Sequence, residues 1–269
     1  MNNGKIIPYG RQFIDEDDIK AVNDVLRSNF LTQGDKVPEF ENAISNRVNS
    51  KFSVAANSAT SVLHIACLAL GVVKDDIVWT SSISFLASAN CAIYCGAKVD
   101  FVDIDLNSGL MDVNALENKL LEASKKGELP KVLIPVHLSG ASCNMKKIHE
   151  LSKIYKFSII EDASHALGGK YLDSEVGSCK FSDICVFSFH PVKIICTGEG
   201  GVGTTNSYML YELMQKYRSH GVEKNPSKML SKNSSPWIYE QQLLGFNYRM
   251  TDIQAALGLS QLKKLDKFV

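Results

Sequence analysis

The chain has 269 residues, of which 45% are hydrophobic and 22% charged, and its 29 Lys and Arg balance its 29 Asp and Glu. This composition excludes an intrinsically disordered chain, a collagen and a coiled coil, and the length corresponds to one large domain or one and a half. The zero net charge, without any long run of Lys or Arg, argues against a protein that binds nucleic acid by neutralising phosphates.

Targeting signals and cysteine spacing point to an ordinary cytoplasmic protein. Residues 1–9 contain no apolar core of signal-peptide length, and no stretch approaches the roughly 20 apolar residues that cross a bilayer, so we expect no membrane partner. The seven cysteines are an odd number, form no C-x-x-C pair and lie mostly in apolar segments. They are predicted to be buried free thiols and not disulfides or zinc ligands.

An amphipathic helix is predicted near the N-terminus, with Ile19, Val22 and Leu26 on one face and Asp15 as its N-cap. Beyond it, β-rich runs alternate with helical patterns. The predicted strands lie at 52–56, 77–81, 99–104, 131–136, 157–162 and 183–189. Because the strands read as continuous apolar runs, they predict a mainly parallel sheet covered by helices on both faces.

The C-terminal third begins with a helix expected near residues 207–220 and a polar loop at 221–236, of the kind that folds over a site. A last helical pattern starts at Thr251 and reaches Val269 without a Gly, Asn or Pro to end it. We expect that further residues follow, or that another chain covers this apolar end.

Candidate site residues follow the strands, because ligands of a parallel α/β sheet bind at the carboxyl ends of its strands. Residues 57–61, NSATS, end a strand and begin a helix. Free N–H groups and hydroxyls at such a place bind phosphate, although an ordinary capped helix start is the alternative. Asp162 ends the most apolar strand, where it either holds a proton on a heteroaromatic nitrogen or caps a helix.

Lys193 is the candidate nucleophile, because it lies between Val192 and Ile194 in the segment SFHPVK. Partial desolvation there would lower its pKa, as Schiff-base chemistry requires, whereas a surface lysine is the ordinary alternative. GEGGVG at 198–203 matches a dinucleotide-binding pattern but continues into a strand, which indicates a tight turn. The sequence has no H-E-x-x-H, P-loop or G-x-S-x-G motif, and its six histidines give no metal-ligand pair.

Seven motifs in the same order resemble the DegT/DnrJ/EryC1/StrS family of sugar aminotransferases over nearly the whole chain. They are NSATS, the Phe85 segment SSISFLASAN, EDASHALG, SFHPVK with GEGG, RSHG, NYRMTD and LGLSQLKKLD. The resemblance implies a three-layer α/β/α fold of the pyridoxal phosphate (PLP)-dependent transferases, aspartate aminotransferase-like and of fold type I. The family's chain normally continues for roughly another hundred residues. The implied division is an N-terminal arm with helices at 1–50, a large PLP-binding domain at 51–250 and, at 251–269, the start of the linking helix to a largely absent C-terminal domain.

The resemblance also implies how the cofactor would be bound. Lys193 would form a Schiff base with PLP, and Asp162 would keep the pyridine nitrogen protonated so that the ring accepts electrons. His165 would lie near the 3-oxygen of the ring, and Phe85 would stack on its face.

Further positions are assigned by the same resemblance. Ser188, Ala59 and Thr60 would hold the phosphate of PLP. Asn247 would reach the phosphate in the neighbouring subunit of a homodimer. The positions that match the substrate pocket are Tyr9, Asn29, Phe30, Leu31, Thr32 and Ser58.

The implied reaction transfers the amino group of glutamate to C4 of a UDP-linked 4-keto-6-deoxy sugar, in pseudaminic acid or related surface-glycan biosynthesis. Lys193 would be both covalent anchor and proton shuttle. Relatives that aminate GDP- and dTDP-linked ketosugars leave another nucleotide sugar as an alternative. Sugar 3-dehydrases of the family have histidine in place of the lysine, so Lys193 argues against them. A non-catalytic remnant that binds PLP is the other alternative.

Overall fold

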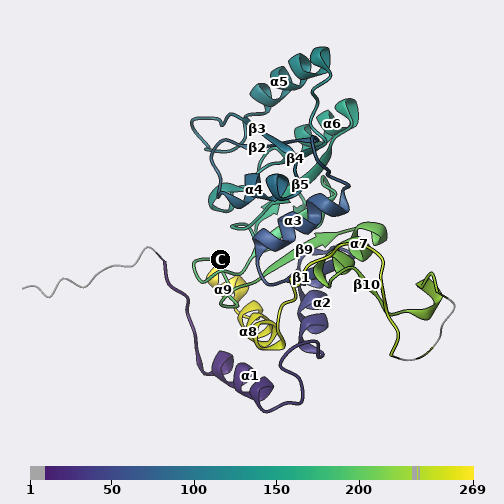
Figure 1. The fold of residues 1–269 in the computed structure, drawn as a ribbon. Coiled ribbons are helices and arrows are strands. Elements are labelled where there is room, and N and C mark those ends of the chain that lie inside the picture. The colour runs from purple at the N-terminus through teal and green to yellow at the C-terminus, as the bar shows by residue number, and fades with distance from the viewer. Residues whose placement is uncertain (1–9, 232–234, 236) are drawn as a thin grey trace, which may run out of the picture.

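The computed structural model describes residues 10–231, 235 and 237–269. In this part of the chain a seven-stranded sheet forms the centre of the molecule, in the order β1-β9-β8-β5-β4-β2-β3 (Figure 1). Its strands are β1 (Phe52–Ala56), β2 (Ile77–Ser81), β3 (Lys98–Val102), β4 (Val132–Ile134), β5 (Ser158–Asp162), β8 (Ile184–Ser188) and β9 (Gly201–Thr205). All pairs are parallel except those of β9, which runs antiparallel between β1 and β8. The predicted mainly parallel sheet is confirmed.

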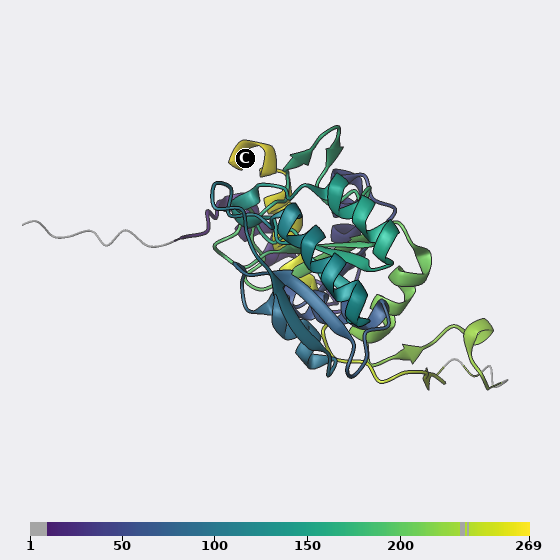
Figure 2. The same cartoon turned by 90° about the horizontal axis from the view of Figure 1, so that it is seen from above.

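Helices cover both faces of the sheet (Figures 1 and 2). On one face lie α3 (Ala59–Ala69), α4 (Ala87–Tyr94) and α7 (Tyr208–Arg218), whose apolar side chains share a buried cluster with the strands. The other face is covered by α2 (Lys36–Val48) with α8 (Asp252–Leu262), and by α5 (Val113–Lys126) with α6 (Met145–Tyr155). The expected three-layer α/β/α arrangement is therefore present.

The first helix, α1 (Glu16–Leu26), begins at Asp15 as predicted, because the Asp15 carboxylate accepts a hydrogen bond from the Asp18 N–H in a capping box. The predicted buried face is wrong. Ile19 and Leu26 are exposed, whereas Asp18 and Val25 are buried. The Asp18 carboxylate accepts from Gln261, in α8, at 2.7 Å and from Lys264, just beyond α8, at 2.8 Å, so the Asp18 face of α1 is the one that lies against α8.

Short elements complete the described chain. They are the hairpin β6 (Lys170–Tyr171) with β7 (Ser174–Glu175), the pair β10 (Val222–Glu223) with β11 (Glu240–Gln241), the 3₁₀ turns η1 (Leu138–Gly140) and η2 (Pro226–Lys228), and the last helix α9 (Leu265–Phe268). The β10–β11 segment projects from the body of the molecule (Figure 2) and contains part of the predicted polar loop. All seven cysteines are free, and all but Cys95 are buried. None of the described helices has the length and hydropathy that crossing a bilayer requires.

A buried ion pair joins α2, β1 and α7. Glu41 accepts hydrogen bonds from the Ala55 N–H at 2.7 Å and from the Arg218 guanidinium at 2.6 Å. The same guanidinium donates to the Ala55 carbonyl at 2.9 Å. Burial raises the pKa of Glu41, and the nearby Arg218 charge opposes the rise. The Glu41 carboxylate therefore links α2, β1 and α7.

We predict that Glu41→Ala lowers the free energy of unfolding by about 3 kcal/mol, because the Ala55 N–H and the largely buried Arg218 guanidinium would both lose their acceptor. Urea denaturation measures the change. Glu39→Ala is the matched control, since Glu39 lies on the same helix in an exposed pair with Lys36 and should cost less than about 1 kcal/mol. Equal losses in the two variants would contradict this assignment.

Candidate active site

The carboxyl edge of the sheet brings several predicted residues together. Asp162 ends β5, Ser188 ends β8, and Ala59 begins α3 just beyond the end of β1. Because β9 is antiparallel, its first residue, Gly201, also lies at this edge, where it pairs with both Ala56 and Ser188. Asp162, Ser188, Gly201 and the start of α3 therefore lie along the same edge of the sheet.

The side chains of this edge point toward the layer of α3 and α4. Ile160 and Val186 belong to the apolar cluster beneath those helices. Side chains alternate along a strand, so Asp162 and Ser188, two residues further on, face the same side. Glu161 faces the opposite layer.

Asp162 is buried, and both oxygens of its carboxylate accept hydrogen bonds in a small network. Ser88 Oγ donates to Oδ2 at 2.6 Å, while the Ser164 N–H and hydroxyl donate to Oδ1 at 3.2 and 2.6 Å. Turns, and no helix, follow Asp162 along the chain, so the N-cap alternative does not apply. A buried carboxylate held in this way is a fixed hydrogen-bond acceptor at this edge of the sheet.

Lys193 and His165 lie within electrostatic range of Asp162 and of each other. Burial lowers the pKa of Lys193, and the Asp162 charge opposes that shift. Burial also lowers the pKa of His165, and the Lys193 charge lowers it further. The Ser139 N–H donates to His165 Nδ1 at 3.2 Å, which leaves the ring hydrogen of the neutral histidine on Nε2.

The beginning of α3 is an open anion cradle. Ser58 Oγ caps the helix by accepting from the Ser61 N–H at 3.1 Å, while the N–H groups of Ala59 and Thr60 have no acceptor among the residues that the structure describes. A Cβ on Gly201 would lie 2.4 Å from the Ala59 nitrogen, so only glycine permits this approach of β9 to the helix. Unpaired N–H groups at a helix N-terminus favour a phosphate.

Phe85 and Asn247 lie on segments that reach this edge. Phe85 is 72% exposed and precedes α4, where its carbonyl accepts from the Ser88 N–H at 3.2 Å. Asn247 pairs with Ser219 in an isolated bridge, and the carbonyl of the next residue, Tyr248, accepts from the Asn57 N–H at 2.8 Å. The NYR motif therefore lies beside the start of α3 in the same chain.

The predicted substrate segment 29–32 connects α1 to α2 and is anchored on α8. The Leu31 carbonyl accepts from the Asp252 N–H at 3.0 Å, and the Asp252 carboxylate accepts from the N–H groups of Gly34 and Lys36 at 2.8 Å each. Two residues further along α8, Gln254 donates to the Glu199 carbonyl at 2.7 Å, in the loop that follows Lys193. The anchor thus places the segment near that loop, with Phe30 and Leu31 exposed.

Tyr9, the remaining predicted substrate residue, lies outside the described residues. The next residue, Gly10, packs against Val192, because a Cβ on Gly10 would lie 3.1 Å from Val192 Cγ1. The described start of the chain therefore passes beside the neighbour of Lys193.

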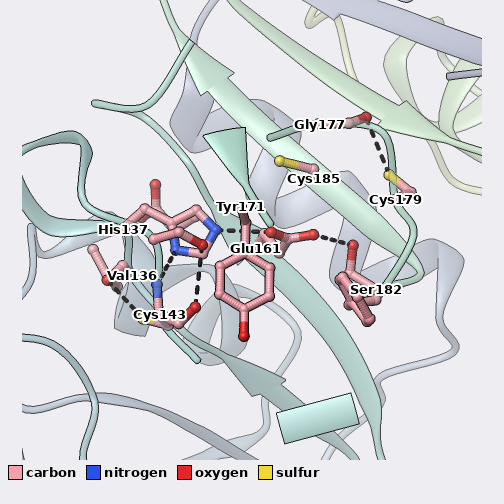
Figure 3. A network of polar contacts seen from close by, with 12 residues as sticks. Val136, His137, Cys143, Glu161, Tyr171, Gly177, Cys179, Ser182 and Cys185 are labelled. Atoms are coloured by element: carbon pink, nitrogen blue, oxygen red, sulfur yellow. Dashed lines mark hydrogen bonds and ion pairs between the residues drawn. The ribbon is translucent and has the colours of Figure 1, made fainter. Parts of the chain in front are cut away.

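A buried network behind Asp162 was not predicted from the sequence (Figure 3). The Cys143 N–H donates to His137 Nδ1 at 3.2 Å, so His137 Nε2 carries the hydrogen that it donates to Glu161 at 2.7 Å. Ser182 donates to the other oxygen of Glu161. The backbone N–H of His137 also donates to the backbone carbonyl of Asp162 at 2.9 Å. This network fixes the end of β5 from the opposite face, and only the alternation of side chains along β5 hints at it.

One large cavity lies apart from this edge of the sheet. A cavity of about 770 Å³ opens between α7 and the β10–β11 segment, with Lys216, Arg218 and Arg249 in its lining, and it reaches neither Lys193 nor Asp162. Within the described residues, no group of three His, Cys, Asp or Glu side chains is placed to hold a metal ion.

We predict that Lys193 reacts with acetic anhydride at a lower pH than exposed lysines, because its lowered pKa leaves more of the neutral amine. Limiting reagent is added at pH values between about 8 and about 11, a range that includes the pKa of an ordinary lysine, and peptide mass spectrometry compares Lys193 with the exposed Lys153. The ratio of Lys193 to Lys153 labelling should rise as the pH falls, since an ordinary lysine is increasingly protonated. A ratio that is independent of pH would contradict the desolvation of Lys193.

Comparisons with known proteins find relatives over nearly the whole chain. The chain is 42% identical over 261 residues to the UDP-4-amino-4,6-dideoxy-N-acetyl-beta-L-altrosamine transaminase of Campylobacter jejuni serotype O:23/36, over 97% of this chain and 65% of that protein. The chain thus spans about two thirds of the length of this relative.

Solved structures show the same fold. Helicobacter pylori PseC, an aminotransferase involved in the biosynthesis of pseudoaminic acid, superimposes with a TM-score of 0.87 at 35% identity, over 98% of this chain and 67% of its own. The PLP-form of the putative sugar aminotransferase Spr1654 from Streptococcus pneumoniae gives a TM-score of 0.83 at 29% identity, over 97% and 67%. Residues 12–269 match the DegT/DnrJ/EryC1/StrS aminotransferase family, and the chain belongs to that family.

Proposed function

We propose that this chain binds PLP at the carboxyl edge of its sheet and is part of an aminotransferase that moves the amino group of glutamate to C4 of a UDP-linked 4-keto-6-deoxy sugar. The reaction would serve pseudaminic acid or related surface-glycan biosynthesis. One observation carries the proposal: at the carboxyl edge of the sheet, the half-buried Lys193 lies within electrostatic range of the buried carboxylate of Asp162.

The residues of this edge fit the three chemical parts of PLP. Lys193 offers an amine for the aldehyde, and Asp162 offers a fixed carboxylate for the ring nitrogen. The free N–H groups of Ala59 and Thr60, with the hydroxyl of Ser188, suit the phosphate, and Gly201 keeps that cradle open. When bound, PLP supplies a carbonyl that condenses with amines and a ring that accepts electrons from a carbanion.

Each side chain then has a role that follows from its position. Lys193 Nζ holds the cofactor at rest and, once released by the amino group of glutamate, takes the proton from Cα. Its lowered pKa lets it act as a base at a lower pH than an ordinary lysine. Asp162 would keep the ring nitrogen protonated, His165 would lie near the 3-oxygen, and Phe85 would stack on the ring.

The substrate proposal rests on the relatives. The Campylobacter relative bears the name of a transaminase of a UDP-linked amino sugar, which favours UDP and C4 for this chain as well. Tyr9, Ser58 and the segment 29–32 would line the sugar pocket. The division into an N-terminal arm at 1–50, a large domain at 51–250 and the start of a linking helix at 251–269 belongs to the same proposal.

A homodimer would complete the site, with Asn247 of one subunit reaching the cofactor phosphate of the other. The segment before α4 and α4 itself support this arrangement, because their apolar side chains face outward beside the site. The exposed ones are Ile83, Phe85, Leu86, Ile93 and Tyr94. A second copy of the chain would cover them.

We predict that Lys193→Ala abolishes transamination, lowering turnover by about a thousandfold or more, because one amine is both anchor and base. The test mixes the purified chain with PLP, adds glutamate and then the UDP-linked ketosugar, and follows visible absorbance. The unaltered chain should show a band that glutamate bleaches and the sugar restores, and Lys153→Ala should behave in the same way. Turnover near the unaltered level in Lys193→Ala would refute the role of this lysine.

We predict that Gly201→Ala lowers the affinity for PLP about tenfold, which is about 1.4 kcal/mol, because the added Cβ would lie 2.4 Å from the Ala59 nitrogen in the cradle. Pyridoxal, which has no phosphate, provides the matched comparison. Its affinity should change by less than about twofold. Fluorescence titration measures both ligands, and equal losses for the two would place the phosphate elsewhere.

A further inference from the structure

The carboxylate of Asp162 has one acceptor position left, and its location is specific. A carboxylate offers about four lone-pair positions, two on each oxygen. The Ser164 N–H and hydroxyl occupy those of Oδ1, and the Ser88 hydroxyl occupies one on Oδ2. Among the described residues no further donor reaches Oδ2. The open position is therefore on the oxygen that Ser88 holds.

Ser88 and Ser164 reach Asp162 from different parts of the chain. Ser164 is two residues from Asp162, in a local turn that an aspartate forms readily. Ser88 is 74 residues away, on the first turn of α4, and is completely buried. Its own N–H donates to the Phe85 carbonyl at 3.2 Å. Ser88 thus links Asp162 to the segment that carries Phe85.

We propose that Ser88 is a positioning residue of this site: its hydroxyl fixes Oδ2 of Asp162 so that the open acceptor position receives the N–H of the pyridine ring of PLP. The inference rests on the proposed cofactor. A hydroxyl has a single hydrogen, and at 2.6 Å that hydrogen is committed to the carboxylate. The same bond stabilises the charged form of a carboxylate that is otherwise buried.

Loss of the Ser88 hydroxyl has an effect beyond stability. Oδ2 would have two open positions, only the Ser164 bonds to Oδ1 would still orient the carboxylate, and its negative charge facing the ring nitrogen would be less well stabilised. The ring would then carry less positive charge. Lys193 Nζ, the nitrogen that would be bonded to PLP, would therefore be more basic. The pH midpoint of the visible absorbance of the bound cofactor should therefore rise.

The experiment compares Ser88→Ala, Ser88→Thr and Ser53→Ala with the unaltered chain, each loaded with PLP. Ser53 is the matched control, because it is also a buried serine and donates at 2.6 Å, to the Glu41 carbonyl, away from Asp162. In Ser88→Ala the absorbance midpoint should rise by about one pH unit. The kcat of the glutamate half-reaction should fall about tenfold at an unchanged KM for glutamate.

Ser88→Thr keeps the hydroxyl and should restore the midpoint, while Ser53→Ala should lose stability without moving it. An unchanged midpoint in Ser88→Ala, with the unaltered chain binding PLP, overturns this inference alone. Failure of the unaltered chain to bind PLP overturns both the inference and the proposed function. If Ser88→Ala does not fold, Ser88→Cys decides, because its weaker S–H donor should give a smaller rise, and no rise would overturn the proposal.

Discussion

The close approach of Gly201 to the first turn of α3 is the constraint on which the site depends. Because β9 runs antiparallel between β1 and β8, it begins at the edge where its neighbours end. Its first residue therefore lies between Ser188 and the start of α3, where a Cβ would collide with the Ala59 backbone. Glycine lets β9 approach the start of α3 at this point, while the N–H groups of Ala59 and Thr60 remain without an acceptor among the described residues.

Two successive residues of β5 place buried carboxylates on opposite faces of the sheet, and both accept hydrogen bonds from residues distant in the sequence. Asp162 accepts from Ser88 on the side of α3 and α4. Glu161 accepts from His137 and Ser182 on the side of α5 and α6 (Figure 3). A buried polar network of this kind is rigid only when every member has a partner. The end of β5 is thereby held from both faces, and Asp162 presents its carboxylate in one direction.

The parallel strands and most of the edge were predictable from the sequence, because apolar runs mark buried strands and parallel strands end together, whereas the antiparallel direction of β9 was not predicted. Asp162, Ser188 and the start of α3 follow from that rule alone. Ser88 does not, since nothing in a sequence aligns a hydroxyl with a carboxylate 74 residues away. The buried face of α1 was mispredicted because the pairing of Asp18 with Lys264 outweighs the apolar pattern of the helix.

The central claim is that Lys193 is the residue to which PLP becomes attached at this edge. The most direct measurement loads the purified chain with PLP, reduces the adduct with borohydride and locates the phosphopyridoxyl group by peptide mass spectrometry. The account predicts a single modified residue, Lys193. Modification spread over the exposed lysines, with Lys193 not preferred, would contradict it.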